Sequence, residues 1–264
     1  MNKFLLLIKV SRPIVWLIAP LVFIGGLYVS SASLSWQSLI QLLLLSFPYC
    51  LLLYGINDVY DYKSDRLNNR KGSVDGLKLN PKYHKFVKQA SLIVIILLLL
   101  SSLITFNFFN IISMISLIFF SYFYSASPIR FKSIPIIDSL SNGIIFLFVA
   151  LLGYSFVNSF DKLPPSVFYL ALCVSGIHAV ASVADYGSDK RAGDRTFAVV
   201  FGKRLAILFA ILLMILSYFF SGIHSLLIKS YFVFCAAVFT VLFANPNEKL
   251  IRMIMYCVYF IALI

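Results

Sequence analysis

Residues 89–106, QASLIVIILLLLSSLITF, form a long apolar stretch without a charged side chain. About 20 helical residues cross the ~30 Å of hydrocarbon in a bilayer, so such a stretch predicts a membrane-spanning helix. Similar stretches recur along the whole chain, which is 61% hydrophobic and only 12% charged. A soluble domain carries about a quarter charged residues. The sequence therefore predicts an all-α integral membrane protein with no separate soluble domain.

Breaks between the apolar stretches predict nine spans. Pro13 suits the first turn of the first helix, and Asn107 and Asn110 separate the third span from the fourth. Pro164–Pro165 precede the sixth span, and Asn245–Pro246–Asn247 end the eighth. The first span is too long for a cleavable signal peptide, and others follow it. The predicted spans lie at about residues 13–31, 38–58, 89–106, 109–125, 134–157, 166–185, 205–221, 229–244 and 250–264.

The basic residues predict the orientation of these spans. Of the 22 lysines and arginines, only Lys162 and Lys229 fall outside the segments that a cytoplasmic N-terminus would place inside. Cytoplasmic segments carry such an excess of cations, so the net charge of +12 is mainly a feature of topology and implies no nucleic-acid partner. We expect a multi-pass protein of the cell membrane, with a cytoplasmic N-terminus. Anchoring at the inner face is the preferred interpretation for Lys78, Lys82, Lys85, Lys88 and Lys249.

Six of the ten acidic residues lie in two short stretches at predicted span ends. The first stretch is Asn57-Asp58-Val59-Tyr60-Asp61-Tyr62-Lys63-Ser64-Asp65, and the second is Asp185-Tyr186-Gly187-Ser188-Asp189 with Asp194 beyond it. Asp61–Asp65 and Asp185–Asp189 are identical at four of five positions, and four predicted spans separate them. Both stretches are therefore predicted at the same membrane face. The pattern indicates an internal repeat of two four-helix units plus a ninth helix.

The spacing of the carboxylates suggests a metal. Asn57, Asp61 and Asp65 follow at i, i+4 and i+8, so one continuous helix would place them on one stripe. Carboxylates stacked in this way repel one another near hydrocarbon. Mg²⁺ would offset that repulsion, because it takes carboxylate oxygens and is completed by waters and substrate phosphates. The alternative, helix-end aspartates that are merely solvated, is left open for Asp58 and Asp194.

Cations follow each acidic stretch directly and suit an anionic substrate. Arginine and lysine bind phosphate oxygens through charge-assisted hydrogen bonds. A third predicted inner loop, Tyr124-Ser-Ala-Ser-Pro-Ile-Arg130-Phe-Lys132, supplies more of them. The residues after the two stretches are Arg66, Arg70 and Lys71, and Lys190, Arg191 and Arg195.

The other potential ligands predict structural roles. The four cysteines stand singly in apolar segments, without the spacing of a zinc site or a disulfide framework. His178 lies seven residues before Asp185, on the same helical face, and is interpreted as a packed or hydrogen-bonded side chain.

With these motifs the chain resembles the UbiA superfamily of intramembrane prenyltransferases over essentially its whole length, as one domain of residues 1–264. Asn57–Asp65 fits the NDxxDxxxD motif of that family, and Asp185–Thr196 fits its DxxxDxxxGxxT motif. Tyr124–Lys132 is similar to its loop between spans four and five. Ala181 stands where the first stretch has Asn57, so the resemblance implies fewer protein ligands in the second metal shell.

The resemblance implies transfer of a prenyl group from an allylic diphosphate to a lipophilic acceptor within the membrane, with no protein partner. The aspartates Asp61, Asp65, Asp185 and Asp189 would be catalytic, and with Asn57 they would hold Mg²⁺. Cytoplasmic active-site loops would bind the diphosphate, and segment 59–88 would close over it. The diphosphate-binding residues implied are Arg66, Lys71, Tyr124, Arg130, Lys132 and Lys190.

Within the superfamily, Pro128–Lys132 and Asp185–Thr196 look most like the carotenoid-modifying, lycopene-elongase branch. Branches that prenylate quinone precursors or glycerolipids share the metal motifs and stay open. CDP-alcohol phosphotransferases use a DGxxAR…GxxxDxxxD pattern that the chain lacks. A cation transporter, the non-enzymatic alternative, would place its acidic residues near mid-membrane on broken helices.

Overall fold

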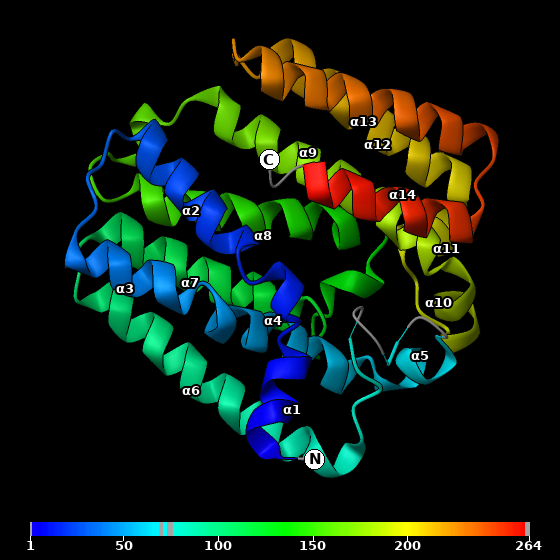
Figure 1. Cartoon of the computed structure of the whole chain (residues 1–264), viewed down its shortest axis with the longest axis horizontal. Helices are drawn as coiled ribbons and strands as arrows, with labels where there is room; N and C mark the ends of the chain where they lie inside the picture. Colours follow the sequence, from blue (N-terminus) through cyan, green and yellow to red (C-terminus); the bar gives the residue numbers. More distant parts are fainter. Residues whose placement is uncertain (1, 69–70, 73–75, 262–264) are drawn as a thin grey trace. The chain divides into compact units, whose positions relative to one another are not determined.

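The computed structural model describes residues 2–68, 71–72 and 76–261 (Figure 1), and every element in these ranges is helical. The chain divides into two compact units. Unit 1 comprises Met1–Arg130 and Phe148–Leu163, and unit 2 comprises Phe131–Leu147 and Pro164–Ile264. Each unit contains one of the two acidic stretches.

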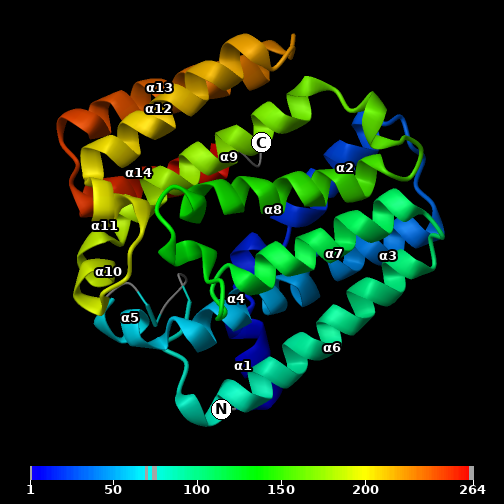
Figure 2. The ribbon, with the colours of Figure 1, turned by 180° about the vertical axis from the view of Figure 1, so that it is seen from behind.

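Unit 1 is built around the hairpin of α6 and α7, which residues 104–107 join (Figure 2). Helix α4 packs against α6, and α1 packs against α4. Asn107 caps α7, because its side chain accepts hydrogen bonds from the N–H groups of Phe109 and Asn110. The elements are α1 (Lys3–Val10), η1 (Pro13–Val15), α2 (Ile18–Val29), α3 (Trp36–Leu44), α4 (Phe47–Tyr60), α5 (Tyr62–Leu67), η2 (Pro81–Tyr83), α6 (His84–Leu103), α7 (Phe108–Phe123), η4 (Phe160–Lys162) and the end of α8 (Ile137–Tyr154).

Unit 2 is centred on α12, which packs against both α9 and α13 (Figure 2). Its core is apolar and includes Val180 of α9, Met214 of α12 and Phe239 of α13, all fully buried. Helix α9 begins at Pro165, one residue before the predicted start of the sixth span, because proline suits a first helical turn. The elements are η3 (Phe131–Ser133), the beginning of α8, α9 (Pro165–Ala184), α10 (Tyr186–Ala192), α11 (Phe197–Phe201), α12 (Lys203–Phe220), α13 (Leu226–Ala244) and α14 (Glu248–Ile261).

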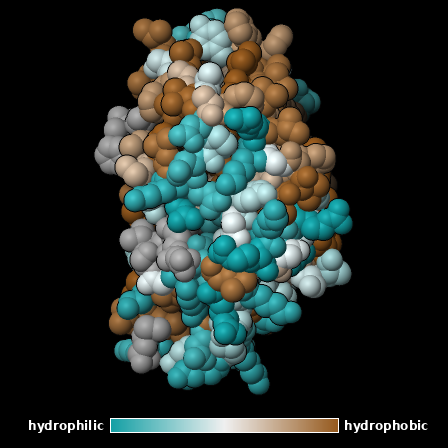
Figure 3. All heavy atoms as spheres, turned by 90° about the vertical axis from the view of Figure 1, so that its right-hand side faces the viewer, coloured by the Kyte–Doolittle hydropathy of each residue, from teal (hydrophilic) through white to brown (hydrophobic). Residues whose placement is uncertain are grey.

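Six helices among the described residues are long and apolar enough to cross a membrane. Counting the bent pair Lys3–Val10 and Pro13–Val29 as one span makes seven. Helices α7 and α14 are shorter, at 16 and 14 residues. The multi-pass prediction is therefore supported, whereas the count of nine spans is not confirmed. Large apolar side chains reach the surface (Figure 3), and Leu43 and Phe219 are 71% and 70% exposed, which suits contact with lipid.

A buried polar cluster holds the helices of unit 1 together. Gln41 of α3 donates through its Nε2 to Asn110 Oδ1 of α7 at 2.7 Å, and Ser102 Oγ donates to the same atom at 2.6 Å. Asn110 Nδ2 in turn donates to Ser155 Oγ at 3.1 Å. Polar side chains within a membrane bundle are favourable when they pair across helices. Asn110 thus fastens α7 inside the unit, rather than only interrupting the chain.

Glycines allow close helix packing along α8. A Cβ atom on Gly26 of α2 would lie 2.0 Å from the carbonyl oxygen of Ala150, and one on Gly153 would lie 2.1 Å from that of Phe23. In unit 2, a Cβ on Gly143 would lie 2.3 Å from the carbonyl oxygen of Ala171 in α9. Such approaches need small residues, which membrane helices use to bring backbones together.

Candidate active site

The first acidic stretch forms a turn between two helices. Helix α4 ends at Tyr60, Asp61 has φ −92° and ψ 9°, and α5 begins at Tyr62. The N–H of Asp65 donates to the carbonyl oxygen of Asp61 at 2.9 Å, and Ser64 Oγ donates to that oxygen at 3.0 Å. The whole residues Asp61 and Asp65 are only 2% and 5% exposed. We call Asp61–Asp65 the first aspartate turn.

The second acidic stretch forms the same turn in unit 2. Helix α9 ends at Ala184, Asp185 has φ −103° and ψ 1°, and α10 begins at Tyr186. The N–H of Asp189 donates to the carbonyl oxygen of Asp185 at 3.0 Å, and Ser188 Oγ does so at 2.9 Å. We call Asp185–Asp189 the second aspartate turn. The repeat seen in the sequence is therefore a repeat of backbone conformation.

This conformation corrects the predicted continuous helix. Because α4 stops at Tyr60, Asn57 and Asp65 lie on two different helices, one on each side of the junction at Asp61. The first aspartate of each turn, Asp61 or Asp185, stands at the junction, and its ψ angle of 9° or 1° is outside the helical range. Neither junction contains proline, so the usual sign of a helix break is missing from the sequence.

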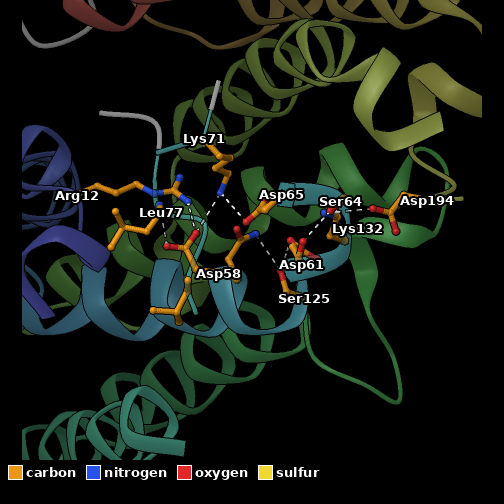
Figure 4. Close-up of polar contacts among 12 residues, drawn as sticks. Arg12, Asp58, Asp61, Ser64, Asp65, Lys71, Leu77, Ser125, Lys132 and Asp194 are labelled. Atoms are coloured by element: carbon orange, nitrogen blue, oxygen red, sulfur yellow. Dashed lines mark hydrogen bonds and ion pairs between the residues drawn. The ribbon is translucent and has the colours of Figure 1, made fainter. Parts of the chain in front are cut away.

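Basic residues surround the first turn within unit 1. Arg130 pairs through Nη2 with Asp61 Oδ1 at 2.9 Å. Ser125 lies beside Asp61 (Figure 4), and its Oγ donates to Asp61 Oδ2 at 3.4 Å. Asn57 Nδ2 donates to Ser125 Oγ at 3.0 Å. Arg130 has φ 50°, a left-handed conformation that is costly for a residue with a side chain. Strain of this kind persists where surrounding contacts hold it, and the ion pair to Asp61 is one such contact.

Lys71 approaches the second carboxylate of the first turn. Its Nζ lies 3.1 Å from Asp65 Oδ2 and 3.1 Å from Asp58 Oδ1 (Figure 4). Burial raises the pKa of Asp65 to about 6, and the positive charge of Lys71 opposes that rise. A carboxyl group in this environment is favoured as an anion only when a cation lies close by.

Asp58 is fully buried, which rules out the open interpretation that it is a solvated helix-end aspartate. Its Oδ1 pairs with Arg12 Nη2 at 2.9 Å as well as with Lys71, and its Oδ2 accepts the N–H of Leu77 at 3.4 Å. The Arg12 guanidinium also stacks 4.2 Å above the Tyr54 ring. Asp58 thus ties the start of the first apolar helices and the chain around Leu77 to α4.

Buried contacts also fix the second turn within unit 2. Asp194 is buried too, and its Oδ2 lies 3.8 Å from Lys132 Nζ (Figure 4). Arg252 of α14 donates from Nη2 to the carbonyl oxygen of Ala184 at 2.9 Å, at the residue just before the turn. Asp138 of α8 accepts the N–H of Phe197 at 2.8 Å, which holds the chain after the turn.

Asp138 and Arg252 are positioning residues that the sequence did not single out as such. The sequence could have indicated the role of Asp138, because an aspartate in the first turn of an apolar helix is unusual. Nothing in the sequence around Arg252 distinguishes it from a cation that only anchors the helix. His178 makes a hydrogen bond, with Nδ1 3.4 Å from Ser139 Oγ, which agrees with a structural interpretation.

The remaining predicted phosphate ligands lie nearer the solvent. Arg66 is exposed and stands 5.8 Å above the Tyr62 ring, and Lys190 is exposed and donates to Tyr186 Oη at 3.4 Å. Tyr124 directly follows α7. Arg70 lies outside the described residues, as does part of the predicted closing segment 59–88.

The donors of each aspartate turn fit Mg²⁺ in kind. Within residues 2–68, 71–72 and 76–261, no three His, Cys, Asp or Glu side chains come together as a group that could hold a metal ion. Mg²⁺ is commonly bound by one or two carboxylates, with waters and substrate phosphates completing its shell. Two carboxylates one turn apart meet that need in each turn, and of the four only Asp185 is not buried.

Membrane-length helices and two aspartate turns of the same backbone conformation define an integral membrane protein with a duplicated acidic site. The UbiA prenyltransferase family model matches residues 17–252. A lycopene elongase/hydratase from Corynebacterium glutamicum is 30% identical over 222 residues, covering 82% of this chain and 76% of that protein. The chain belongs to the UbiA prenyltransferase family, and it is a prenyltransferase.

Solved structures show the same fold. A UbiA homologue from Archaeoglobus fulgidus bound to DMAPP and Mg²⁺ has a TM-score of 0.68 at 20% identity, over 97% of this chain and 96% of that chain. A structure described for digeranylgeranylglyceryl phosphate synthase has a TM-score of 0.70 at 23% identity, over 99% and 95%. Because the chain belongs to a family of enzymes, the alternative interpretation as a cation transporter is dropped.

Proposed function

We propose that this prenyltransferase moves a prenyl group from an allylic diphosphate to a hydrophobic acceptor within the membrane in a Mg²⁺-dependent reaction. The repeated aspartate turn is the observation that carries the proposal. The two turns share the same backbone hydrogen bonds and the same junction aspartate, and Asp61, Asp65 and Asp189 are buried. A membrane protein tolerates such buried charge at a functional site. Asn57, Asp61 and Asp65 would hold metal in unit 1, and Asp185 and Asp189 in unit 2.

The cations are proposed to hold the diphosphate. Arg130 and Lys71 already lie within ion-pair distance of Asp61 and Asp65, so acidic and basic groups of the first turn share one small region. An arriving diphosphate would give these cations a second anionic partner. The full proposed set is Arg66, Lys71, Tyr124, Arg130, Lys132 and Lys190.

The chemistry follows from charge. The carbon–oxygen bond of the allylic diphosphate breaks with its electron pair on the departing pyrophosphate, whose oxygens the arginines and lysines bind. When present, Mg²⁺ supplies further positive charge at those oxygens, and stabilisation of this kind is typically a large catalytic term. The allylic cation is protected from water among the apolar helices, and an electron-rich carbon of the acceptor captures it to form the new carbon–carbon bond. The acceptor cation that results then loses a proton to the departing pyrophosphate or to water.

A carotenoid such as lycopene is the acceptor that we propose. The relative from Corynebacterium glutamicum, whose name is lycopene elongase/hydratase, supports this choice. A quinone precursor or a glycerolipid would be prenylated by the same chemistry and is the alternative. Placement of the N-terminus and the aspartate turns on the cytoplasmic side is likewise a proposal, which rests on the distribution of lysine and arginine.

Substitution of the junction aspartates tests the proposed site. We expect Asp61→Ala and Asp185→Ala each to lower Mg²⁺-dependent pyrophosphate release from geranylgeranyl or dimethylallyl diphosphate by roughly 100-fold, because transition-state charge would lose a stabilising partner. Asp161→Ala is the matched control, since Asp161 of η4 is exposed and belongs to neither turn. Release at the wild-type rate by either junction variant would contradict the assignment.

A further inference from the structure

An uncompensated cluster of positive charge lies at the start of α6. Lys78, Lys82, Lys85 and Lys88 fall within eleven residues, and the chain has no aspartate or glutamate between Gly76 and Ile137. In the part of the chain that the structure describes, none of these lysines forms an ion pair. The cluster therefore differs from Lys71 and Arg130, whose charges meet aspartates.

Two of these lysines line a shallow, open groove of about 440 Å³, whose lining residues all belong to α6. Two of these residues also contact neighbouring parts of unit 1. His84 Nε2 donates to the carbonyl oxygen of Leu79 at 3.1 Å, and Lys88 Nζ stands 4.5 Å above the Tyr60 ring. Lys85 and Gln89 are exposed, and neither side chain hydrogen-bonds to another described residue. The lining residues are His84, Lys85, Lys88, Gln89 and Leu92.

An apolar stripe continues from this groove along α6. Leu92, Ile96 and Leu100 are 56%, 48% and 52% exposed. With Lys85 and Gln89 they follow at intervals of three or four residues, so all five side chains lie on one face of the helix. Polar, positive groups thus stand at the beginning of a membrane-spanning helix, and apolar groups follow on the same face. Figures 1 and 2 show α6 as a long helix whose beginning lies beside α1.

We propose that this groove binds the phosphate headgroup of an acidic phospholipid, with an acyl chain along the apolar stripe. Lys85 and Lys88 supply the charge, Gln89 supplies an amide hydrogen-bond donor, and Leu92 begins the path for the chain. Anionic lipid surfaces attract lysines near membrane-spanning helices. A metal–diphosphate suits the groove poorly, because its lining contains no carboxylate for the metal. Membrane topology alone would explain lysines on one side of the membrane. It would not explain a groove that is followed by a continuous apolar stripe on the same face of α6.

Native mass spectrometry of the full chain in detergent tests the proposal. The wild type is expected to retain phosphatidylglycerol in preference to phosphatidylcholine with the same acyl chains. The double variant Lys85→Gln/Lys88→Gln is expected to lose that preference by about fivefold per lysine, the contribution expected of a cation near an anionic lipid surface. Both lysines are exposed, so these changes leave the buried structure intact.

The matched control is Arg204→Gln/Lys249→Gln, which also removes two exposed cations from segments predicted to be cytoplasmic. It is expected to retain phosphatidylglycerol as the wild type does. Equal retention by the wild type and Lys85→Gln/Lys88→Gln, or equal loss in the control, would overturn the proposal. Displacement of the bound lipid by inorganic pyrophosphate from the wild type alone would assign the groove to the diphosphate instead.

Discussion

Asp58 and Asp61 stand three residues apart, yet their carboxylates belong to different parts of unit 1. Asp61 meets Arg130 and Ser125 from the chain that follows α7. Asp58 is enclosed by Arg12, Lys71 and the N–H of Leu77. Asp61 is thus placed for the reaction that we propose, whereas Asp58 joins three segments of the fold.

Removing the Asp58 carboxylate should destabilise the protein. Asp58→Ala leaves the Arg12 guanidinium without its ion-pair partner, whereas Lys71 keeps Asp65. Breaking a buried ion pair in this way typically costs about 3–5 kcal/mol. The free energy of unfolding in mixed micelles measures this effect. We expect Asp161→Ala, which removes an exposed carboxylate, to unfold at the wild-type denaturant concentration. An unfolding free energy of Asp58→Ala within error of the wild type would contradict the structural role.

Part of the site could be predicted from residue types alone. Scarce acidic residues that recur as DYKSD and DYGSD mark both aspartate turns without any structure. Their partners could not be assigned, because Arg130 and Arg252 reach their contacts across 69 and 68 residues of chain. Asp58 resembles Asp61 in sequence and in burial, and the ion pairs of Asp58 with Arg12 and Lys71 distinguish the two.

Helix α8 illustrates packing at the scale of elements. Its beginning meets α9 in unit 2 through Gly143, and its end meets α2 in unit 1 through Gly153. Gly26 of α2 makes the reciprocal approach to Ala150. Lipid supplies no hydrophobic force between apolar helices, so close van der Waals contact carries much of their association.

Neighbouring glycines of α2 provide a direct comparison. We expect Gly26→Ala to lower the free energy of unfolding by about 1–3 kcal/mol, because its Cβ would overlap the carbonyl group of Ala150. Gly25→Ala meets no atom within 4 Å and should leave stability unchanged or raise it slightly, since alanine favours the helix. Thermal unfolding of both variants in the same detergent measures the difference. Equal midpoints would show that the close approach contributes nothing.

Most helices could be predicted from apolar length and from proline and asparagine at their ends. The break of α4 at Asp61 and of α9 at Asp185 could not, because no helix-breaking residue stands at either position. Helix α14 lies at the predicted ninth span but is only 14 residues long in the described part of the chain. Because about 20 helical residues are needed to cross a bilayer, the apolar composition of α14 does not by itself establish a span.

At the scale of the whole molecule, the duplication in the sequence corresponds to two compact units that each contain one aspartate turn. The division does not follow the predicted four-helix boundaries, because α8 is shared between the units. The charge distribution belongs to the whole chain as well. Cations concentrate in the segments that carry the aspartate turns and the α6 groove, a distribution that is typical of cytoplasmic segments and supports the proposed orientation.

Expression in a lycopene-producing host tests the central claim most directly, because the extracted pigments report prenyl transfer itself. The wild-type chain should convert lycopene into carotenoids heavier by whole prenyl units, as measured by mass spectrometry. Cells with Asp61→Ala or Asp185→Ala, at matched protein levels, should keep the lycopene profile of the empty host. Pigments that are unchanged by the wild-type chain would contradict the carotenoid acceptor, and elongated pigments in either variant would contradict the role of the aspartate turns.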